Sequence, residues 1–427
     1  MRRAGVLCHI TSLPMGTLGE DADRFCHTLA NVGCSVWQML PITPPDEHRS
    51  PYASSSAFAI STQLSNPYIR YRFDYDEVDR WVEENLYWLE DWALFEVLKE
   101  LFEGKPWTEW PSRIREREEV AIAEIKEELE GPMSSWIQRQ FTVKIDWDSL
   151  KGTAEECGVK LFGDLPFFLA HDSADVWANQ HLFKLEESGA PAVVAGVPPD
   201  YFSEDGQRWG TVLYDWDAHR ADGFTWWKSR MTRMFELFDM VRIDHFRAID
   251  SAWEIPAHHP TAKNGTWEAG PGEELLEAIL SVSPEGGLVA EDLGIIPESV
   301  VALREKAGLP GMAVLHFASD EPENPHNPEN HTENQVVYTG THDNDTTVGW
   351  GKKPVKEMMT AALSSPAELA ILPLQDVMRL GSEARMNTPG THEGNWQWRF
   401  EWEELKMQDL NWLGQQIHMN DRAPRSR

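Results

Sequence analysis

The segment 241–247 places an acid, a histidine and two arginines beside apolar residues. Residues 240–243 have the apolar character of a short buried strand, and Asp244 follows it directly. A carboxylate is rarely buried without a partner, and we expect Arg242 and Arg247 to hold Asp244 ionised by opposing its charge. An ionised, fixed carboxylate beside His245 is what a glycosyl-transferring nucleophile needs. The alternative is a purely structural Asp–Arg pair, because ion-pair networks also perturb carboxylates.

Two further acids have neighbours that suit the same chemistry. Glu291 ends the apolar segment 287–291, so desolvation is expected to raise its pKa and to suit it to general acid/base catalysis. Its alternative role is that of a helix N-cap neighbour. Asp343 follows His342, and a third carboxylate can hold ring hydroxyls and favour an oxocarbenium-like state. Asp343 could instead be a turn residue; we expect no metal, because 343–345 lacks the glycine and distal glutamate of a calcium loop.

Strands and helices must bring these acids together. Helical spacing occurs at 20–32, 134–158, 224–238, 272–280 and 297–306, between short apolar segments. This order predicts an α/β fold, a (β/α)8 TIM barrel that forms one catalytic domain over residues 1–427. The long segments 41–66 and 196–210 are expected to be active-site loops. The eight segments expected to be strands are 5–10, 34–40, 159–165, 240–244, 287–291, 311–316, 335–339 and 369–374.

In a barrel of this kind, polar residues at the carboxyl ends of strands form the site. That rule selects Asp164, Asp244, Glu291, His342 and Asp343, which come from four separate strands. Because these acids are expected to converge on one face, a purely structural role is less favoured for each of them.

Two segments depart from the barrel pattern. Residues 67–133 are rich in charge and helical in period, which predicts a helical insertion subdomain within the domain. The tail from Arg385 is rich in aromatic residues and is expected to be disordered after Asp421.

The composition excludes several classes of partner. Asp plus Glu is 70 against 38 Lys plus Arg, a net charge of −32, which repels nucleic-acid phosphate and anionic lipid. A neutral sugar fits such a surface better, and 20 tryptophans are compatible with stacking on sugar rings, although most should pack in the core. The acid excess could be a salt adaptation, but a solubilising surface is the simpler explanation. The four cysteines show no paired spacing, and no signal peptide or membrane span is apparent, so we expect a cytoplasmic protein.

Several longer motifs carry a family resemblance. The chain resembles the amylomaltases, also called disproportionating enzymes or 4-α-glucanotransferases, of glycoside hydrolase family 77. The matching segments run nearly end to end: HITSLP (9–14), WQMLP (37–41), SPY (50–52), GDLP (163–166), SADVW (173–177), 194–210, VRIDHFR (241–247), AEDLG (290–294), GTHDNDT (340–346), RMN (385–387) and GNW (394–396).

The resemblance implies a function and a role for each matching residue. It implies transfer of α-1,4-glucan segments between maltooligosaccharides in maltodextrin, starch or glycogen metabolism, by a retaining double displacement without cofactor or metal. Asp244 would be the nucleophile, Glu291 the acid/base and Asp343 the transition-state stabiliser. The implied substrate-binding residues are Arg242, His245, His342, Tyr52, Asp164, Ser50, Gln207, Trp209 and, as residues that could equally belong to turns, Asn387 and Asn395.

Some features depart from the family pattern. The insertion 67–133 is shorter than usual, which puts in doubt the secondary glucan-binding surface often built there, and Thr211-Val212 replaces a usual Asn-Pro. Two alternatives stay open: an α-1,4-glucan hydrolase of the α-amylase type with water as acceptor, and an inactive glucan-binding scaffold. The sequence predicts neither the oligomeric state nor the preferred chain length.

Overall fold

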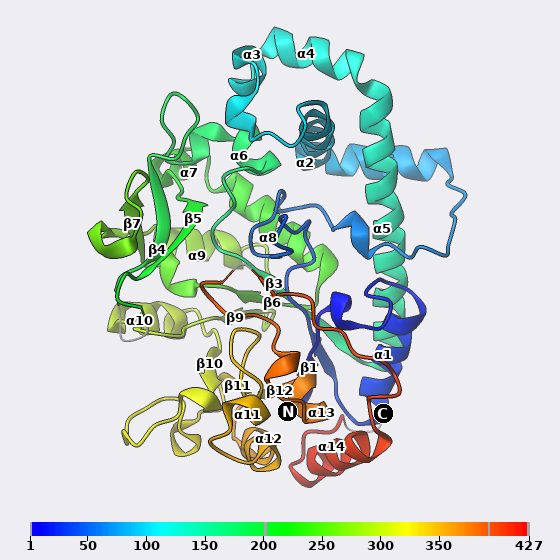
Figure 1. Cartoon of the computed structure of the whole chain (residues 1–427), viewed down its shortest axis with the longest axis vertical. Coiled ribbons are helices and arrows are strands. Elements are labelled where there is room, and N and C mark those ends of the chain that lie inside the picture. Colours follow the sequence, from blue (N-terminus) through cyan, green and yellow to red (C-terminus); the bar gives the residue numbers. More distant parts are fainter. Residues whose placement is uncertain (1, 200–202, 392, 425–427) are drawn as a thin grey trace.

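A parallel barrel sheet forms the centre of the molecule. The computed structural model describes residues 2–199, 203–391 and 393–424. The hydrogen-bonded strand order is β10-β11-β12-β1-β2-β3-β6-β9. Figure 1 shows strands of this sheet, among them β3, β6 and β9, in the middle of the molecule. All eight predicted strands are confirmed: β1 (Arg3–Leu7), β2 (Val36–Gln38), β3 (Lys160–Leu165), β6 (Met240–Ile243), β9 (Leu288–Ala290), β10 (Gly311–Val314), β11 (Gln335–Tyr338) and β12 (Leu369–Pro373).

The barrel has a seam between β9 and β10, the two ends of this order. The Ala290 N–H donates to the Pro310 carbonyl at 2.9 Å. Beyond that bond, the Asp292 carboxylate accepts from the Met312 N–H at 2.7 Å. A side chain thus takes the place of a backbone ladder bond directly beside Glu291.

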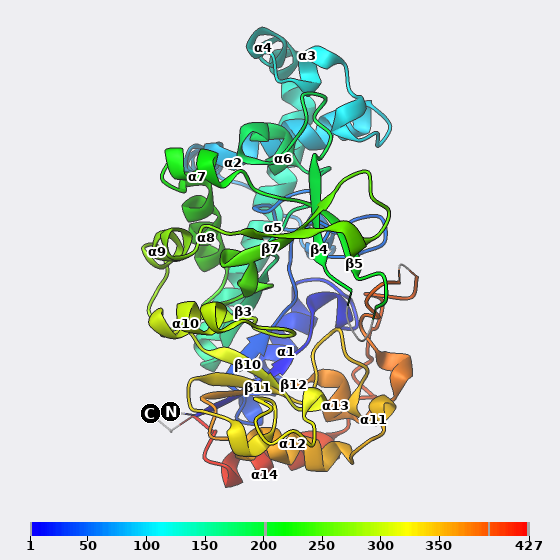
Figure 2. The same ribbon diagram turned by 90° about the vertical axis from the view of Figure 1, so that its left-hand side faces the viewer.

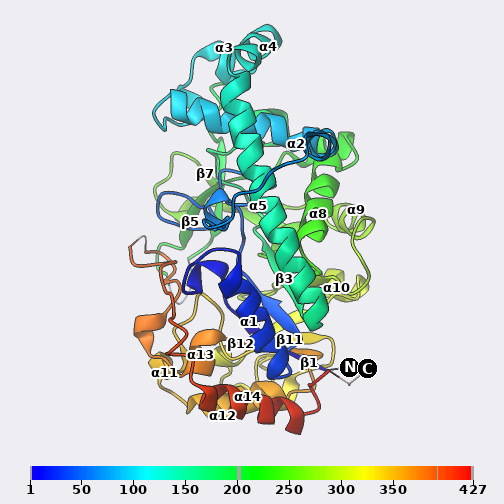
Figure 3. The ribbon, with the colours of Figure 1, turned by 90° about the vertical axis from the view of Figure 1, so that its right-hand side faces the viewer.

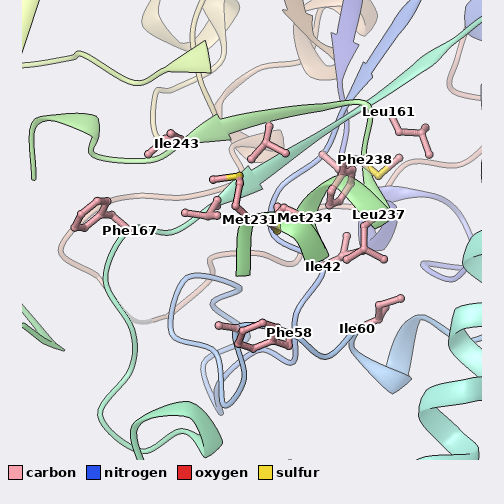
Figure 4. Packing of buried hydrophobic residues seen from close by; sticks show 14 of the residues in the cluster. Ile42, Phe58, Ile60, Leu161, Phe167, Met231, Met234, Leu237, Phe238 and Ile243 are labelled. Carbon is pink, nitrogen blue, oxygen red and sulfur yellow. The ribbon is translucent and has the colours of Figure 1, made fainter. Parts of the chain in front are cut away.

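Helices cover the outside of the barrel because each has an apolar face that the strands bury. Met231, Met234 and Leu237 of α8 pack with Phe238 against Leu161 of β3 (Figure 4). The helices expected from the sequence occur close to their predicted bounds, and two more follow late in the chain: α1 (Glu20–Asn31), α5 (Glu130–Cys157), α8 (Thr225–Leu237), α9 (Glu273–Leu280), α10 (Glu298–Lys306), α12 (Val355–Ser364) and α14 (Met407–Met419).

Three helices and the start of α5 gather at one end of the molecule (Figures 1 and 3). They are α2 (Tyr75–Leu101), α3 (Ser112–Arg115) and α4 (Glu119–Glu128). Helix α5 begins at Glu130 and runs from this end back to the barrel (Figure 3). Pro132 lies in its first turn, where the missing N–H costs no helical bond.

A second sheet flanks the barrel, and the sequence did not predict it. It is antiparallel, in the order β5-β4-β7-β8. Figure 2 shows β4, β5 and β7 of this sheet. Segment 196–210 was expected to be a loop; its two ends instead belong to paired strands, while the predicted loop residues 200–202 lie outside the described residues. The strands are β4 (Val193–Val197), β5 (Gln207–Val212), β7 (Ser251–Pro256) and β8 (Thr266–Ala269).

The expectation that the tail is disordered after Asp421 is wrong for Arg422. The Arg422 side chain is fully buried and donates to the carbonyls of Leu363, Arg3 and Ser365. These bonds connect Arg422 to β1 and to residues 363–365. Residues 425–427 of the predicted tail lie outside the described residues. The short helices that complete the described chain are α6 (Ala174–Ala178), α7 (Trp216–Ala221), α11 (Thr347–Trp350) and α13 (Leu374–Met378). Of the helices described, none has both the length and the apolar character to cross a membrane.

Candidate functional site

Arg242 joins the acids of two neighbouring strands. β3 and β6 pair in register, with Asp164 opposite Arg242. One Arg242 nitrogen, Nη1, donates to both carboxylate oxygens of Asp164 at 2.8 and 2.6 Å, and Nη2 lies 2.8 Å from Asp244 Oδ1. The Asp164 side chain is 1% exposed, whereas that of Asp244 is 28% exposed. The guanidinium therefore fixes Asp244 at the end of β6 with its carboxylate open to a ligand.

Glu291 approaches Asp244 from the adjacent strand. It follows β9, which pairs with β6. Its Oε2 accepts from the His245 N–H at 2.6 Å, and its Oε1 accepts from the Leu293 N–H at 2.9 Å. The nearest downstream helix begins only at Glu298, so the alternative role beside a helix N-cap does not apply.

Asp343 is held by a segment that comes much later in the chain. Asn387 Nδ2 donates to Asp343 Oδ1 at 2.6 Å, and the Asn387 N–H donates to the His342 carbonyl at 3.1 Å. Arg385 donates to the Asp343 carbonyl at 2.7 Å and to the Asn387 carbonyl at 2.7 Å. The carboxylate and the backbone of Asp343 thus have separate supports.

Tyr52 and His342 form an aromatic wall beside these acids. Their rings stack with centroids 5.2 Å apart and an interplanar angle of 13°, and Trp396 lies 5.7 Å from Tyr52 and 5.9 Å from His342. The Tyr52 hydroxyl donates to Asp164 Oδ2 at 2.7 Å. The wall is therefore tied to the same carboxylate that anchors Arg242.

Trp209 lies on β5, next to His245. Its ring meets that of His245 edge-on with centroids 4.9 Å apart. Its indole N–H donates to Gln207 Oε1 at 3.2 Å, which links the two residues predicted from this segment. Because Trp209 is 39% exposed, it offers an apolar surface above His245.

The electrostatics of the acids differ in part from expectation. Burial raises the pKa of Glu291, as predicted, although Arg242 and two backbone N–H groups lower it. Burial also raises the pKa of Asp244, and Asp164, Glu291 and Asp343 add to that rise against the opposing effect of Arg242. Arg242 thus lowers the pKa of Asp244, as predicted, but burial, which is the largest effect, and the neighbouring carboxylates raise it, so the net shift is upward.

Arg247, the second arginine expected to oppose Asp244, points elsewhere. His245 adopts a left-handed backbone with φ 54° and the following residues, Phe246–Ile249, form a 3-10 turn. The Arg247 guanidinium consequently lies 3.8 Å from the Trp267 ring and donates to the Ile295 carbonyl at 2.6 Å. It is not part of the carboxylate cluster.

Burial favours the neutral form of both site histidines. Burial lowers the pKa of His245 to about 3, and burial also lowers the pKa of His342. Neutral imidazoles can form hydrogen bonds with sugar hydroxyls without adding charge.

Two predicted residues have local contacts rather than contacts with the acids. The Ser50 hydroxyl accepts from the Tyr52 N–H at 3.3 Å. The Asn395 side chain bonds to Thr388 and Thr391, which is the turn role that the sequence left open. Conversely, Arg385 and Trp396 belong to the site although they were noted only as parts of motifs.

Comparisons with known proteins match most of the chain to one family. The family model described as 4-alpha-glucanotransferase matches residues 7–75, 70–356 and 351–406. The chain is 42% identical to a 4-alpha-glucanotransferase of Thermus thermophilus over 472 aligned positions, covering 93% of this chain and 94% of that protein. It is 37% identical to one of Aquifex aeolicus, with 93% and 95% covered.

Solved structures agree. An amylomaltase from Streptococcus agalactiae, in complex with acarbose, superposes with a TM-score of 0.93 at 30% identity, covering 99% of this chain and 100% of that one. An α-amylase from Lactobacillus plantarum superposes with a TM-score of 0.51 at 10% identity, covering 99% and 80%. The second likeness shows the barrel fold alone.

Proposed function

Because the chain belongs to the 4-alpha-glucanotransferase family, we propose that it transfers α-1,4-glucan segments between maltooligosaccharides by a retaining double displacement on Asp244. The proposal is supported chiefly by one observation. The Arg242 guanidinium bridges Asp164 and Asp244 and leaves Asp244 the more exposed of the two. A held, reachable carboxylate is what the covalent step requires.

The same ion pair assigns the proton. Arg242 lies 2.8 Å from Asp244, whereas no ion pair among the described residues includes Glu291. When one proton is shared in a cluster of acids, it stays on the carboxyl that lacks the close cation. Although burial raises the pKa of both carboxyls, we infer from this ion pair that Asp244 is the ionised nucleophile and Glu291 the protonated acid.

In the first step, Glu291 donates its proton to the glycosidic oxygen while Asp244 attacks the anomeric carbon. The C–O bond to the leaving glucan breaks, and a bond from the Asp244 carboxylate to the sugar forms with inversion. Asp343, held by Asn387 at 2.6 Å, binds ring hydroxyls and stabilises the oxocarbenium-like transition state. Tyr52 and His342 bound this reactive sugar on the aromatic side.

In the second step, Glu291 removes the proton from the 4-hydroxyl of an acceptor glucan. That oxygen attacks the anomeric carbon and releases Asp244, so the α-1,4 configuration is regained. Transfer exceeds hydrolysis only where an acceptor sugar displaces water from the site. Exposed Trp209 on β5, with Gln207 bonded to it, offers the sugar a stacking surface.

We also propose that the catalytic domain spans residues 1–427 and carries a shortened insertion at 67–133. The alignment with the Thermus protein has 472 positions, more than the 427 residues of this chain, so the relative contains segments that this chain lacks. The family match is divided at residues 70–75, at the entry to α2, and again at residues 351–356. Only the first division lies within the segment 67–133. That position supports a loss within the insertion.

Incubation with maltotriose tests the function. The expected products are glucose and a ladder of longer oligomers, whereas glucose and maltose alone would indicate a hydrolase. Asp244→Ala should lower kcat at least about a thousandfold, as loss of a nucleophile does. Glu368→Ala is a suitable control, because Glu368 pairs with Arg3 at the amino end of β12. Unchanged turnover in Asp244→Ala would overturn the nucleophile assignment, whereas no turnover of maltotriose by the natural chain would favour an inactive glucan-binding scaffold.

A further inference from the structure

The loop that carries His342 and Asp343 is closed at its base by one buried carboxylate. Loop residues 340–346 lie between Thr339 and Thr347, which flank them directly in the sequence. Asp376 Oδ2 accepts from the Thr339 hydroxyl at 2.5 Å and from the Thr347 hydroxyl at 2.7 Å. Asp376 Oδ1 accepts from the Thr347 N–H at 2.7 Å. Both ends of the loop are therefore bonded to the same side chain.

Burying the Asp376 carboxylate at the base of the loop costs free energy. Asp376 is 1% exposed, and both threonines are fully buried. No ion pair among the described residues includes it, so its three hydrogen bonds must offset the cost of burying the carboxylate. An apolar residue would fill the same volume without that cost, which points to a requirement for the bonds themselves.

His316 extends this arrangement to a third strand end. Its Nε2 lies 3.0 Å from the Thr347 hydroxyl oxygen, and its ring stacks on Trp350 with centroids 4.4 Å apart. Because the Thr347 hydroxyl donates to Asp376, it accepts from the His316 Nε2–H. A Cβ on Gly340 would lie 2.9 Å from His316, so the imidazole also backs the first residue of the loop.

We propose that Asp376 is a positioning residue for Asp343. It fixes the two ends of loop 340–346, while Asn387 fixes the Asp343 carboxylate at the tip. The inference rests on the proposed function, since it assigns Asp376 to the step in which Asp343 stabilises the transition state. A shift of about 1 Å in a catalytic group can lower a rate a hundredfold, so the loop base must be held closely.

Asp376→Asn tests the proposal with little change in shape. An amide has one acceptor oxygen where the carboxylate has two, so an NH2 group must face either the Thr347 N–H or the two hydroxyls. We expect kcat on maltotriose to fall about tenfold or more, with KM changed less than about twofold, because the lost support acts in the transition state. Thr347→Val should act in the same direction, and Thr347→Ser should restore the wild-type kcat.

Asp146→Asn is a matched control for burial. Asp146 is 4% exposed and also accepts three bonds, from the Ser65 hydroxyl at 2.6 Å, the Asn66 N–H at 2.8 Å and the Tyr71 hydroxyl at 2.6 Å. Those bonds connect α5 to 65–71 rather than to the acids. We expect Asp146→Asn to lower the unfolding temperature and to keep kcat when assayed well below that temperature.

A double-mutant cycle separates positioning from general stability. In an Asp343→Asn background, Asp376→Asn should change kcat less than about twofold, because the group it positions is gone. An equal fold-change in both backgrounds, or wild-type kcat in Asp376→Asn, overturns the proposal. If Asp376→Asn does not fold, equal kcat in Thr347→Val and Thr347→Ser overturns it. Wild-type protein that forms no oligomer ladder contradicts the proposed function instead.

Discussion

At the scale of single residues, the proton on Glu291 decides whether the first step of the proposed mechanism can occur. Burial raises the pKa of this carboxyl above the ordinary glutamate value of about 4.3. Glu291 acts as an acid only while protonated, so the rate falls as pH rises through the raised pKa. We expect kcat/KM on maltotriose to have an alkaline limb set by Glu291.

Glu291→Gln gives a sharper prediction when the leaving group is varied. An activated donor such as α-maltosyl fluoride needs little protonation to leave, so its first step should depend less on the acid. We compare the fold loss of initial rate, variant against wild type, for the two donors. This fold loss should be at least about tenfold smaller with the fluoride, measured by fluoride release, than with maltotriose, measured by glucose release. Asp244→Ala should show no such relief, and an equal loss with both donors would contradict the role of Glu291.

The residues at strand ends were predictable from the barrel rule, whereas Tyr52 and Asn387, which lie on irregular backbone, were predicted only through the family resemblance. Asp164, Asp244 and Glu291 follow apolar strand segments, so the barrel rule places them at one face. Arg247 was misplaced because the left-handed turn at His245 cannot be inferred from the spacing of the heptapeptide. Arg385 and Trp396 come from the tail after the last strand, where no periodicity indicates their direction.

At the scale of elements, the antiparallel sheet gives the site a wall that the barrel alone lacks. Strands β4 and β5 present Gln207 and Trp209 above His245. The glycine- and proline-rich sequence around them indicated a loop, because short strands that pair across a connection have weak local signals. The long barrel helices, in contrast, were predicted from their apolar spacing.

Trp209→Ala should change the fate of the glycosyl-enzyme. Loss of the indole removes a stacking surface for the acceptor sugar, and an aromatic contact is worth about 1 kcal/mol. Water then competes better with the acceptor sugar. We expect a several-fold higher ratio of hydrolysis to transfer on maltotriose, measured as reducing ends formed per oligomer. Trp209→Phe serves as the control and should keep most of the wild-type ratio; an unchanged ratio in Trp209→Ala would exclude Trp209 from acceptor selection.

At the scale of the whole molecule, the excess of acid should make stability depend on salt. The net charge is −32, so the excess carboxylates of the folded protein repel one another. Raising the ionic strength from 0.1 to 1 M shortens the screening length from about 10 to about 3 Å. We expect the unfolding temperature to rise by several degrees over that range of sodium chloride. Sucrose at equal osmolality controls for exclusion effects, and a flat or falling unfolding temperature in salt would show that repulsion does not limit stability.

The contact between the two ends of the described chain also has a practical side. Arg422 donates to the Arg3 carbonyl at 2.8 Å, and Arg3 begins β1, whereas the catalytic acids follow the carboxyl ends of their strands. We therefore expect a polypeptide joined before Arg3 or after Arg422 to leave from the amino end of β1 rather than from the carboxyl ends of the strands, where the acids lie. Immobilisation on a support through either end would leave the mouth of the barrel accessible even to long, bulky glucans.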